Sequence, residues 1–214
     1  MGSGEWEVDF RGVSCVMRSF LFLPLLLAAV PLSAQTHYYA RLGPVFSSRI
    51  VRDVLYEPVV TRPGMAPTLF AGFGVPFGGK YRGGIEVSLG RAGLSTSTPD
   101  TPNAPDTDLG SVWQGTAMAM LDAPIRSRFR GRAGIGAIRY MPSEDDGMWA
   151  QGGTTRILFG AGLDYEMPAS AFWNVMISAR YDYHRFTTPE LRSRGFRLEQ
   201  PVNRLSLSVG LAGR

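Results

Sequence analysis

Residues 173–186 read Trp-Asn-Val-Met-Ile-Ser-Ala-Arg-Tyr-Asp-Tyr-His-Arg-Phe, and apolar and polar side chains alternate along them. Successive side chains of a β-strand point to opposite faces, so a period of two predicts a strand. The apolar face comprises Trp173, Val175, Ile177, Ala179, Tyr181 and Tyr183. The opposite face comprises Asn174, Ser178, Arg180, Asp182 and His184. A strand with both Arg180 and Asp182 on its second face does not fit an ordinary apolar core.

The same alternation recurs through the rest of the chain beyond Gln35, where no apolar stripe of helical period is convincing. Seven further segments show it: 38–46, 67–77, 81–93, 110–121, 128–140, 154–166 and 202–212. The connections between the eight segments are short and long in alternation. Short ones are 78–80, 122–127 and 167–172, and long ones are 47–66, 94–109, 141–153 and 187–201. This layout predicts an all-β fold, an eight-stranded antiparallel up-and-down transmembrane β-barrel with both ends on one side.

The two faces of the predicted strands differ in chemistry. Near the short turns the apolar face carries aromatic side chains, as a girdle at a membrane interface would: Tyr38, Phe77, Tyr81, Phe129, Tyr165 and Trp173. The other face carries the charges, so we expect it to line the lumen, where Arg side chains would bridge carboxylates. The predicted lumen charge network is Arg41, Arg82, Glu86, Arg130, Arg132, Arg156, Asp164, Glu166, Arg180, Asp182 and Arg204, with Arg128 on the same face.

The N-terminal region has the features of a secretory signal peptide. Residues 17–19 supply a positive charge, residues 20–30 are apolar, and Ala34 supplies a small residue for cleavage before Gln35. We therefore expect residues 1–34 to be a signal peptide and 35–214 to form the barrel domain. Acidic residues before Met17 are unusual in such a peptide. A start of translation at Met17 would explain them, because residues 1–16 would then not be translated.

The composition of the 214 residues bounds the function. Net charge is +4, but the arginines are scattered without a basic run, which argues against nucleic-acid binding. Two histidines and one cysteine do not supply a recognisable zinc site, and the strand glycine pairs lack the following helix of a nucleotide loop. We expect no cofactor, no metal and no enzymatic activity. The 41 glycine and proline residues suit strand bends and loops.

On strand count, loop alternation and aromatic placement, residues 36–214 resemble the small eight-stranded outer-membrane proteins of Gram-negative bacteria, the OmpA-, OmpX- and OmpW-type barrels. The resemblance implies residence in the outer membrane, contact with its lipid and lipopolysaccharide, and insertion by the barrel-assembly machinery. Family members usually end on an aromatic residue that this machinery reads, whereas this chain ends on Arg214.

The predicted role is structural or surface-interacting, with a loop partner that the sequence does not identify. Arg91, Arg139 and Arg185 lie on the outward face at the long-loop ends, where Arg geometry suits lipopolysaccharide phosphates.

Three other readings stay open at this stage. The first is a narrow conduit for small apolar compounds, with inward candidates Met118, Met120, Leu158 and Met176. The second is an enzyme of the lipid A deacylase kind that uses His184. The third is a soluble lipocalin-like barrel, which would bury its apolar face inside.

Overall fold

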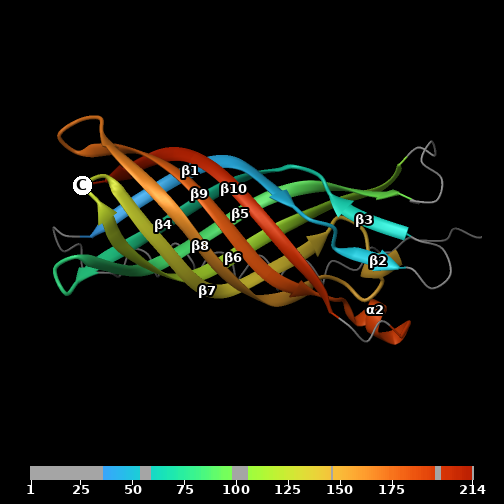
Figure 1. Ribbon diagram of the computed structural model, residues 1–214. Helices are drawn as coiled ribbons and strands as arrows, with labels where there is room; N and C mark the ends of the chain where they lie inside the picture. The colour runs from blue at the N-terminus through green and yellow to red at the C-terminus, as the bar shows by residue number, and fades with distance from the viewer. Residues whose placement is uncertain (1–35, 54–58, 98–105, 146, 196–198, 214) are drawn as a thin grey trace, which may run out of the picture. The chain divides into compact units, whose positions relative to one another are not determined.

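Eight long antiparallel strands form a closed barrel (Figure 1). The computed structural model describes residues 36–53, 59–97, 106–145, 147–195 and 199–213, so the predicted signal peptide lies outside the described residues. The barrel strands are β1 (His37–Ser47), β4 (Ala66–Phe77), β5 (Tyr81–Ser97), β6 (Thr107–Arg126), β7 (Phe129–Pro142), β8 (Thr154–Pro168), β9 (Trp173–Phe186) and β10 (Gln200–Gly213). The predicted fold class is confirmed.

The first and last strands close the ring. Tyr39 of β1 is registered with Gly72 of β4 on one side and with Ala212 of β10 on the other. The short turns and the end of β10 lie at the same mouth of the barrel, which we call the turn end (Figure 1). Gly78 and Gly79 have φ values of 55° and 75°, which glycine adopts without strain, so they make the tight β4–β5 turn.

The opposite mouth, the loop end, carries structure that the sequence pattern did not predict. Within 47–66, β2 (Val51–Asp53) and β3 (Val59–Pro63) form a hairpin, and β3 pairs with the end of β5. Within 187–201 a one-turn helix, α2 (Pro189–Ser193), begins after Thr188, whose side chain caps the Leu191 amide. A 3₁₀ turn, η2 (Gly147–Trp149), lies in the connection between β7 and β8.

Two strands extend at least four residues beyond the C-terminal ends that the alternation predicted. The segments expected over 81–93 and 110–121 extend to Ser97 and to Arg126. Residues 122–127, expected as a turn, continue β6 up to a register shift between Pro124 and Arg126. This correction matters because the extension carries Asp122 into the barrel interior, where it is buried.

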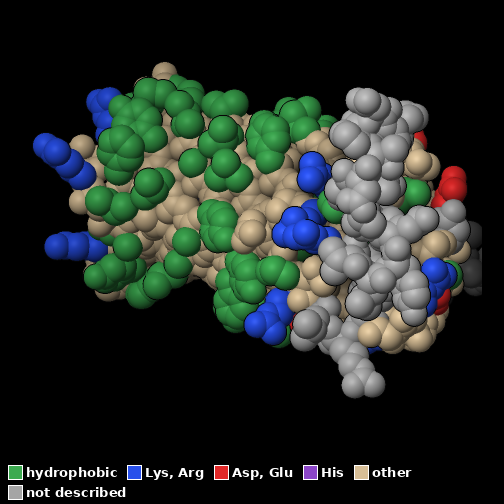
Figure 2. Space-filling model, turned by 45° about the vertical axis from the view of Figure 1, so that its right-hand side comes forward, with side chains coloured by type: hydrophobic (Ala, Val, Ile, Leu, Met, Phe, Trp, Pro, Cys, Tyr) green, Lys and Arg blue, Asp and Glu red, His purple; other side chains and the backbone are tan. Residues whose placement is uncertain are grey.

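The outer wall is apolar. Hydrophobic side chains cover the described barrel wall in Figure 2, with Lys and Arg side chains toward both ends of it. The large exposed members include Leu42, Leu69, Ile85, Leu121, Ile135, Ile157, Phe159, Leu163, Ile177, Leu205, Leu207 and Val209. A lipocalin-like barrel would have the reverse arrangement, so that reading is wrong. No helix within the described ranges is long and apolar enough to span a membrane.

Candidate functional site

The barrel interior centres on a buried carboxylate, that of Glu86 on β5. Three arginines from three other strands donate to it: Arg41 on β1, Arg132 on β7 and Arg180 on β9. The Arg132 Nη1 lies 3.1 Å from Glu86 Oε2, and all four side chains are at least 97% buried. Charges this far from water are tolerated when they are paired and hydrogen-bonded.

Three aspartates pair with the same arginines. Arg132 Nε lies 2.8 Å from Asp122 Oδ1 and 3.2 Å from Asp164 Oδ2. Arg180 Nη2 donates to Asp182 Oδ2 over 3.1 Å. These three aspartates, Glu86 and its three arginines define the central network: Arg41, Glu86, Asp122, Arg132, Asp164, Arg180 and Asp182. It joins strands from all around the ring and fills the middle of the lumen.

Tyr39 completes the central network, although the sequence analysis did not predict a role for it. Its hydroxyl donates to Glu86 Oε2 over 2.9 Å and accepts from Arg132 Nη2. Its ring lies under two guanidinium groups, with the Arg132 Cζ 4.8 Å and the Arg41 Cζ 5.1 Å from the ring centroid. Tyr39 has the same parity as Arg41, which was the signal available in the sequence. Asp122 was missed because it was assigned to a turn.

Five predicted network members lie elsewhere in the lumen. At the turn end, Arg82 Nη1 pairs with Glu166 Oε1 at 3.0 Å, and Arg130 Nη2 donates to the Lys80 carbonyl. At the loop end, Arg156 Nε donates to the Thr187 carbonyl, and its Nη1 lies 3.4 Å from Glu199 Oε1. Arg204 lies deeper and donates to Gln114 Oε1 over 3.1 Å. The charges therefore occupy three levels along the barrel.

An aromatic group above the central network fills the lumen toward the loop end. Phe186 of β9 packs edge-on against Tyr140 of β7 and Trp149 of η2, with centroid distances of 5.2 Å and 5.6 Å. The Tyr140 hydroxyl lies 2.9 Å from His184 Nε2, and both residues are buried. We call Tyr140, Trp149, His184 and Phe186 the aromatic plug. Thr188 Oγ1 donates to the Met148 carbonyl, which ties α2 to η2 above it.

The three arginines predicted at the outer rim are exposed near the loop end. Arg91 donates to Ser111 Oγ from Nε and Nη2, and its Cζ lies 5.7 Å from the Trp113 ring centroid. Arg139 is registered with Gly115 of β6, and Arg185 with Pro201 of β10. The described part of the chain offers neither of these two side chains a hydrogen bond or an ion pair.

No family model matches the sequence, and no curated protein matches it. Solved structures do match its fold. The crystal structure of Neisserial surface protein A aligns with a TM-score of 0.50 and 13% identity, covering 84% of this chain and 96% of that chain. The chain has the fold of the small eight-stranded outer-membrane barrels.

Two further outer-membrane proteins align with the chain. OprG from Pseudomonas aeruginosa does so with a TM-score of 0.48 and 12% identity, over 83% of this chain and 94% of that chain. AlkL, solved in lipid bilayers, has a TM-score of 0.49 and 14% identity, over 83% and 88% of the two chains.

The outer-membrane barrel fold accounts for the inverted chemistry of this chain. An eight-stranded ring leaves a lumen that side chains can fill, so charges go inside and apolar groups face outward. Within the described ranges, no group of three or more His, Cys, Asp or Glu side chains could hold a metal ion.

Proposed function

We propose that this protein is a closed outer-membrane barrel with a structural or surface-interaction role in the cell envelope. The single observation that carries the proposal is an apolar outer wall around a lumen filled by paired charges. A wall of this kind is stable in lipid, and a lumen crossed by buried ion pairs gives the wall a rigid support. Outer-membrane barrels have short turns on the periplasmic side and long loops outside, so the turn end faces the periplasm and the loop end faces the cell exterior.

The packing of the lumen argues against a conduit for apolar compounds. Met118, Met120 and Leu158, the inward candidates for a conduit wall, are buried in one cluster with the aromatic plug. Met176 packs with Tyr39 and Ala212 instead. These apolar side chains fill space between charged levels, and a solute would have to displace both.

His184 supports the non-enzymatic reading. Its side chain is 1% exposed, and the hydrogen-bond partner that the structure gives its Nε2 is the phenol of Tyr140. A catalytic base must reach the proton it removes, within hydrogen-bond distance or through one water. A histidine that is buried and hydrogen-bonded to the Tyr140 phenol fits a packing role better than a role as catalytic base.

The rim arginines suit lipopolysaccharide at the outer leaflet. Arg91, Arg139 and Arg185 lie on the outer wall beyond the apolar band, and guanidinium groups bind phosphate through paired N–H groups. Arg91 is held in place by Ser111 and Trp113, while the other two extend from the wall. Three separate strands thus present cations at one rim.

Membrane fractionation of a Gram-negative host that expresses the full chain tests the location. We expect outer-membrane recovery and faster gel migration of the unheated protein, and recovery in a soluble fraction would refute the proposal. Planar-bilayer recording should show no steady conductance. A stable single-channel conductance would favour the conduit instead.

Lipopolysaccharide binding needs its own test. The triple replacement of Arg91, Arg139 and Arg185 by Ala should weaken lipopolysaccharide binding, while Arg126→Ala at the turn-end rim should not. Arg126 is a matched control because it is also exposed on the barrel, at the opposite mouth. Equal binding by both variants would remove the rim arginines from the proposal.

A further inference from the structure

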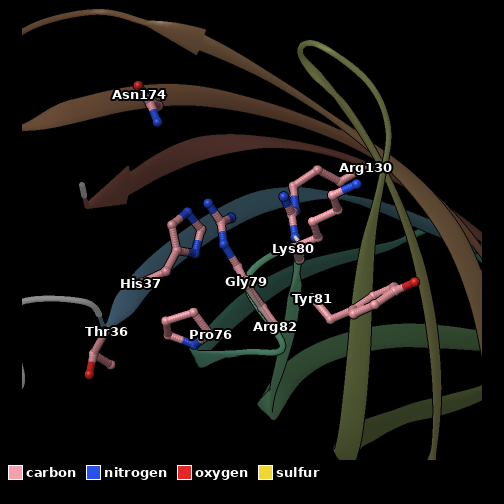
Figure 3. Close-up of a pocket in the computed structure, with 9 residues that line it drawn as sticks. All are labelled: Thr36, His37, Pro76, Gly79, Lys80, Tyr81, Arg82, Arg130 and Asn174. Atoms are coloured by element: carbon pink, nitrogen blue, oxygen red, sulfur yellow. Dashed lines mark hydrogen bonds between the residues drawn. The ribbon is translucent and has the colours of Figure 1, made fainter.

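The turn-end mouth contains a cavity of about 260 Å³ whose lining is mostly basic or polar. Figure 3 shows the His37 ring beside the Arg82 side chain, with Lys80 and Arg130 next to one another. The lining residues are Thr36, His37, Pro76, Gly79, Lys80, Tyr81, Arg82, Arg130 and Asn174.

A second cavity of about 230 Å³ shares part of this lining. Arg82, Arg130 and Asn174 border both cavities, and Arg128 and Glu166 border the second. Across the two cavities four cationic side chains, Lys80, Arg82, Arg128 and Arg130, face one carboxylate. Positive charge in a concave, partly enclosed site concentrates anions because the low-dielectric walls focus the field.

These cations are not equally paired, and at least one of them keeps an N–H donor available for an anion. Arg82 is paired with Glu166, whereas Arg130 has no carboxylate within ion-pair distance among the described residues. Arg130 Nε is buried without a hydrogen-bond partner. A buried N–H group without a partner costs free energy, which a bound acceptor would recover.

His37 provides a second, independent observation. Its side chain lines the first cavity and is 93% buried, yet neither ring nitrogen has a hydrogen-bond partner. Its Nε2 lies 3.7 Å from Glu166 Oε1, too far for a hydrogen bond. Even a neutral imidazole carries one N–H, so His37 can donate to an oxyanion in this cavity.

We propose that the turn-end mouth binds a phosphate-class oxyanion, either a soluble phosphate ester or the headgroup of an anionic phospholipid. Arg130, Arg82 and Lys80 supply the charge, and His37 supplies a neutral donor. Three cations suit the double charge of a phosphate monoester, and guanidinium groups match its oxygens in pairs. The inference rests on the cavity itself and holds whether or not the proposed envelope role is correct.

Calorimetric titration of the full chain in nonionic detergent with inorganic phosphate tests the site. Arg130→Gln should weaken binding about tenfold, as expected for a lost charge-assisted hydrogen bond. Lys80→Gln should also weaken it, and Lys80 is exposed, so this variant keeps the test valid if Arg130→Gln fails to fold. Glu166→Gln should strengthen binding because it removes the one carboxylate that borders the cavities.

Arg126→Gln is the matched control, since Arg126 lies at the same mouth but does not line either cavity. Its affinity should equal that of the parent. Absence of phosphate binding, or equal affinities in the Arg130, Glu166 and Arg126 variants, would overturn the proposal. Adding phosphatidylglycerol to the micelles separates the two sources. Competition with phosphate supports the lipid headgroup, and no competition supports a soluble ester.

Discussion

Arg132 on β7 reaches Glu86 on β5 across the intervening strand β6, with 3.1 Å between Nη1 and Oε2. The bond therefore joins two strands that do not pair with each other directly. Arg41 and Arg180 meet the same carboxylate from β1 and β9. One side chain of β5 is thus attached to three other strands of the ring.

Replacing the central carboxylate should destabilise the barrel strongly. Glu86→Gln leaves three buried guanidinium groups around a neutral amide, and breaking a buried pair costs about 3–5 kcal/mol. Urea unfolding in lipid vesicles, followed by tryptophan fluorescence, measures the free energy of unfolding. Glu199→Gln removes the partly exposed partner of Arg156 and should cost less than about 1 kcal/mol. Similar losses in the two variants would refute a special role for the central network.

Space for Tyr39 depends on a neighbouring glycine. A Cβ at Gly72 would lie 2.5 Å from the Tyr39 Oη and 2.8 Å from the Ile85 carbonyl oxygen. Gly72→Ala should therefore displace Tyr39 and destabilise the barrel by about 1–3 kcal/mol, the usual cost of overpacking. At Gly115 the nearest atom to a new Cβ is 3.7 Å away, so Gly115→Ala is the control. The same unfolding measurement applies, and a neutral Gly72→Ala would contradict the packing argument.

The apolar wall predicts how the chain responds to a charge in its middle. Ala179 is exposed on the wall and is registered with Leu163 and Leu207. In lipid, Ala179→Arg should cost about 2–4 kcal/mol of unfolding free energy. Thr107→Arg introduces the same charge at the exposed start of β6 and should have little effect. If Ala179→Arg is as harmless as Thr107→Arg, the wall does not face lipid.

Trp149 of the aromatic plug should hold the loop end closed. Trp149→Ala removes a ring that is 3% exposed and contacts both Tyr140 and Phe186, and such truncations cost about 3–5 kcal/mol. We expect faster trypsin cleavage after Arg192, within α2, or after Arg194, which directly follows it, measured by mass spectrometry. Trp113→Ala, on the exposed wall, should leave the cleavage rate unchanged. An unchanged cleavage rate in Trp149→Ala would contradict the claim that the aromatic plug holds the loops in place.

The alternation of side chains was enough to predict the ring of strands. In segments such as 173–186 the apolar and charged faces are cleanly separated, and that pattern fixes strand type and parity together. It was not enough at the strand ends. Around Asp122 the pattern blurs into Ala123 and Pro124, so a buried acid was assigned to a turn. The β2–β3 hairpin and α2 are too short to show a period.

The ion-pair partners of each charged residue could not be predicted from the sequence, for a different reason. Parity says that Arg132 and Glu86 both point inward, but their contact depends on strand tilt and on the register between β5, β6 and β7. It also depends on glycines that keep space open. The turn-end cavity was missed for the same reason, because His37 and Asn174 lie far apart in the sequence and meet through ring closure.

The attachment of Glu86 to β1, β7 and β9 has a consequence for biogenesis. Strands β1 to β5 precede the other barrel strands in the chain. Two of the three arginines that donate to Glu86, Arg132 and Arg180, lie on strands that come later. With β7 and β9 not yet in place, Glu86 would keep Arg41 but lack the other two arginines, and an incompletely paired buried charge costs several kcal/mol. Complete pairing of the interior charges therefore favours the closed barrel, with β1 paired to β10, over a partly assembled one.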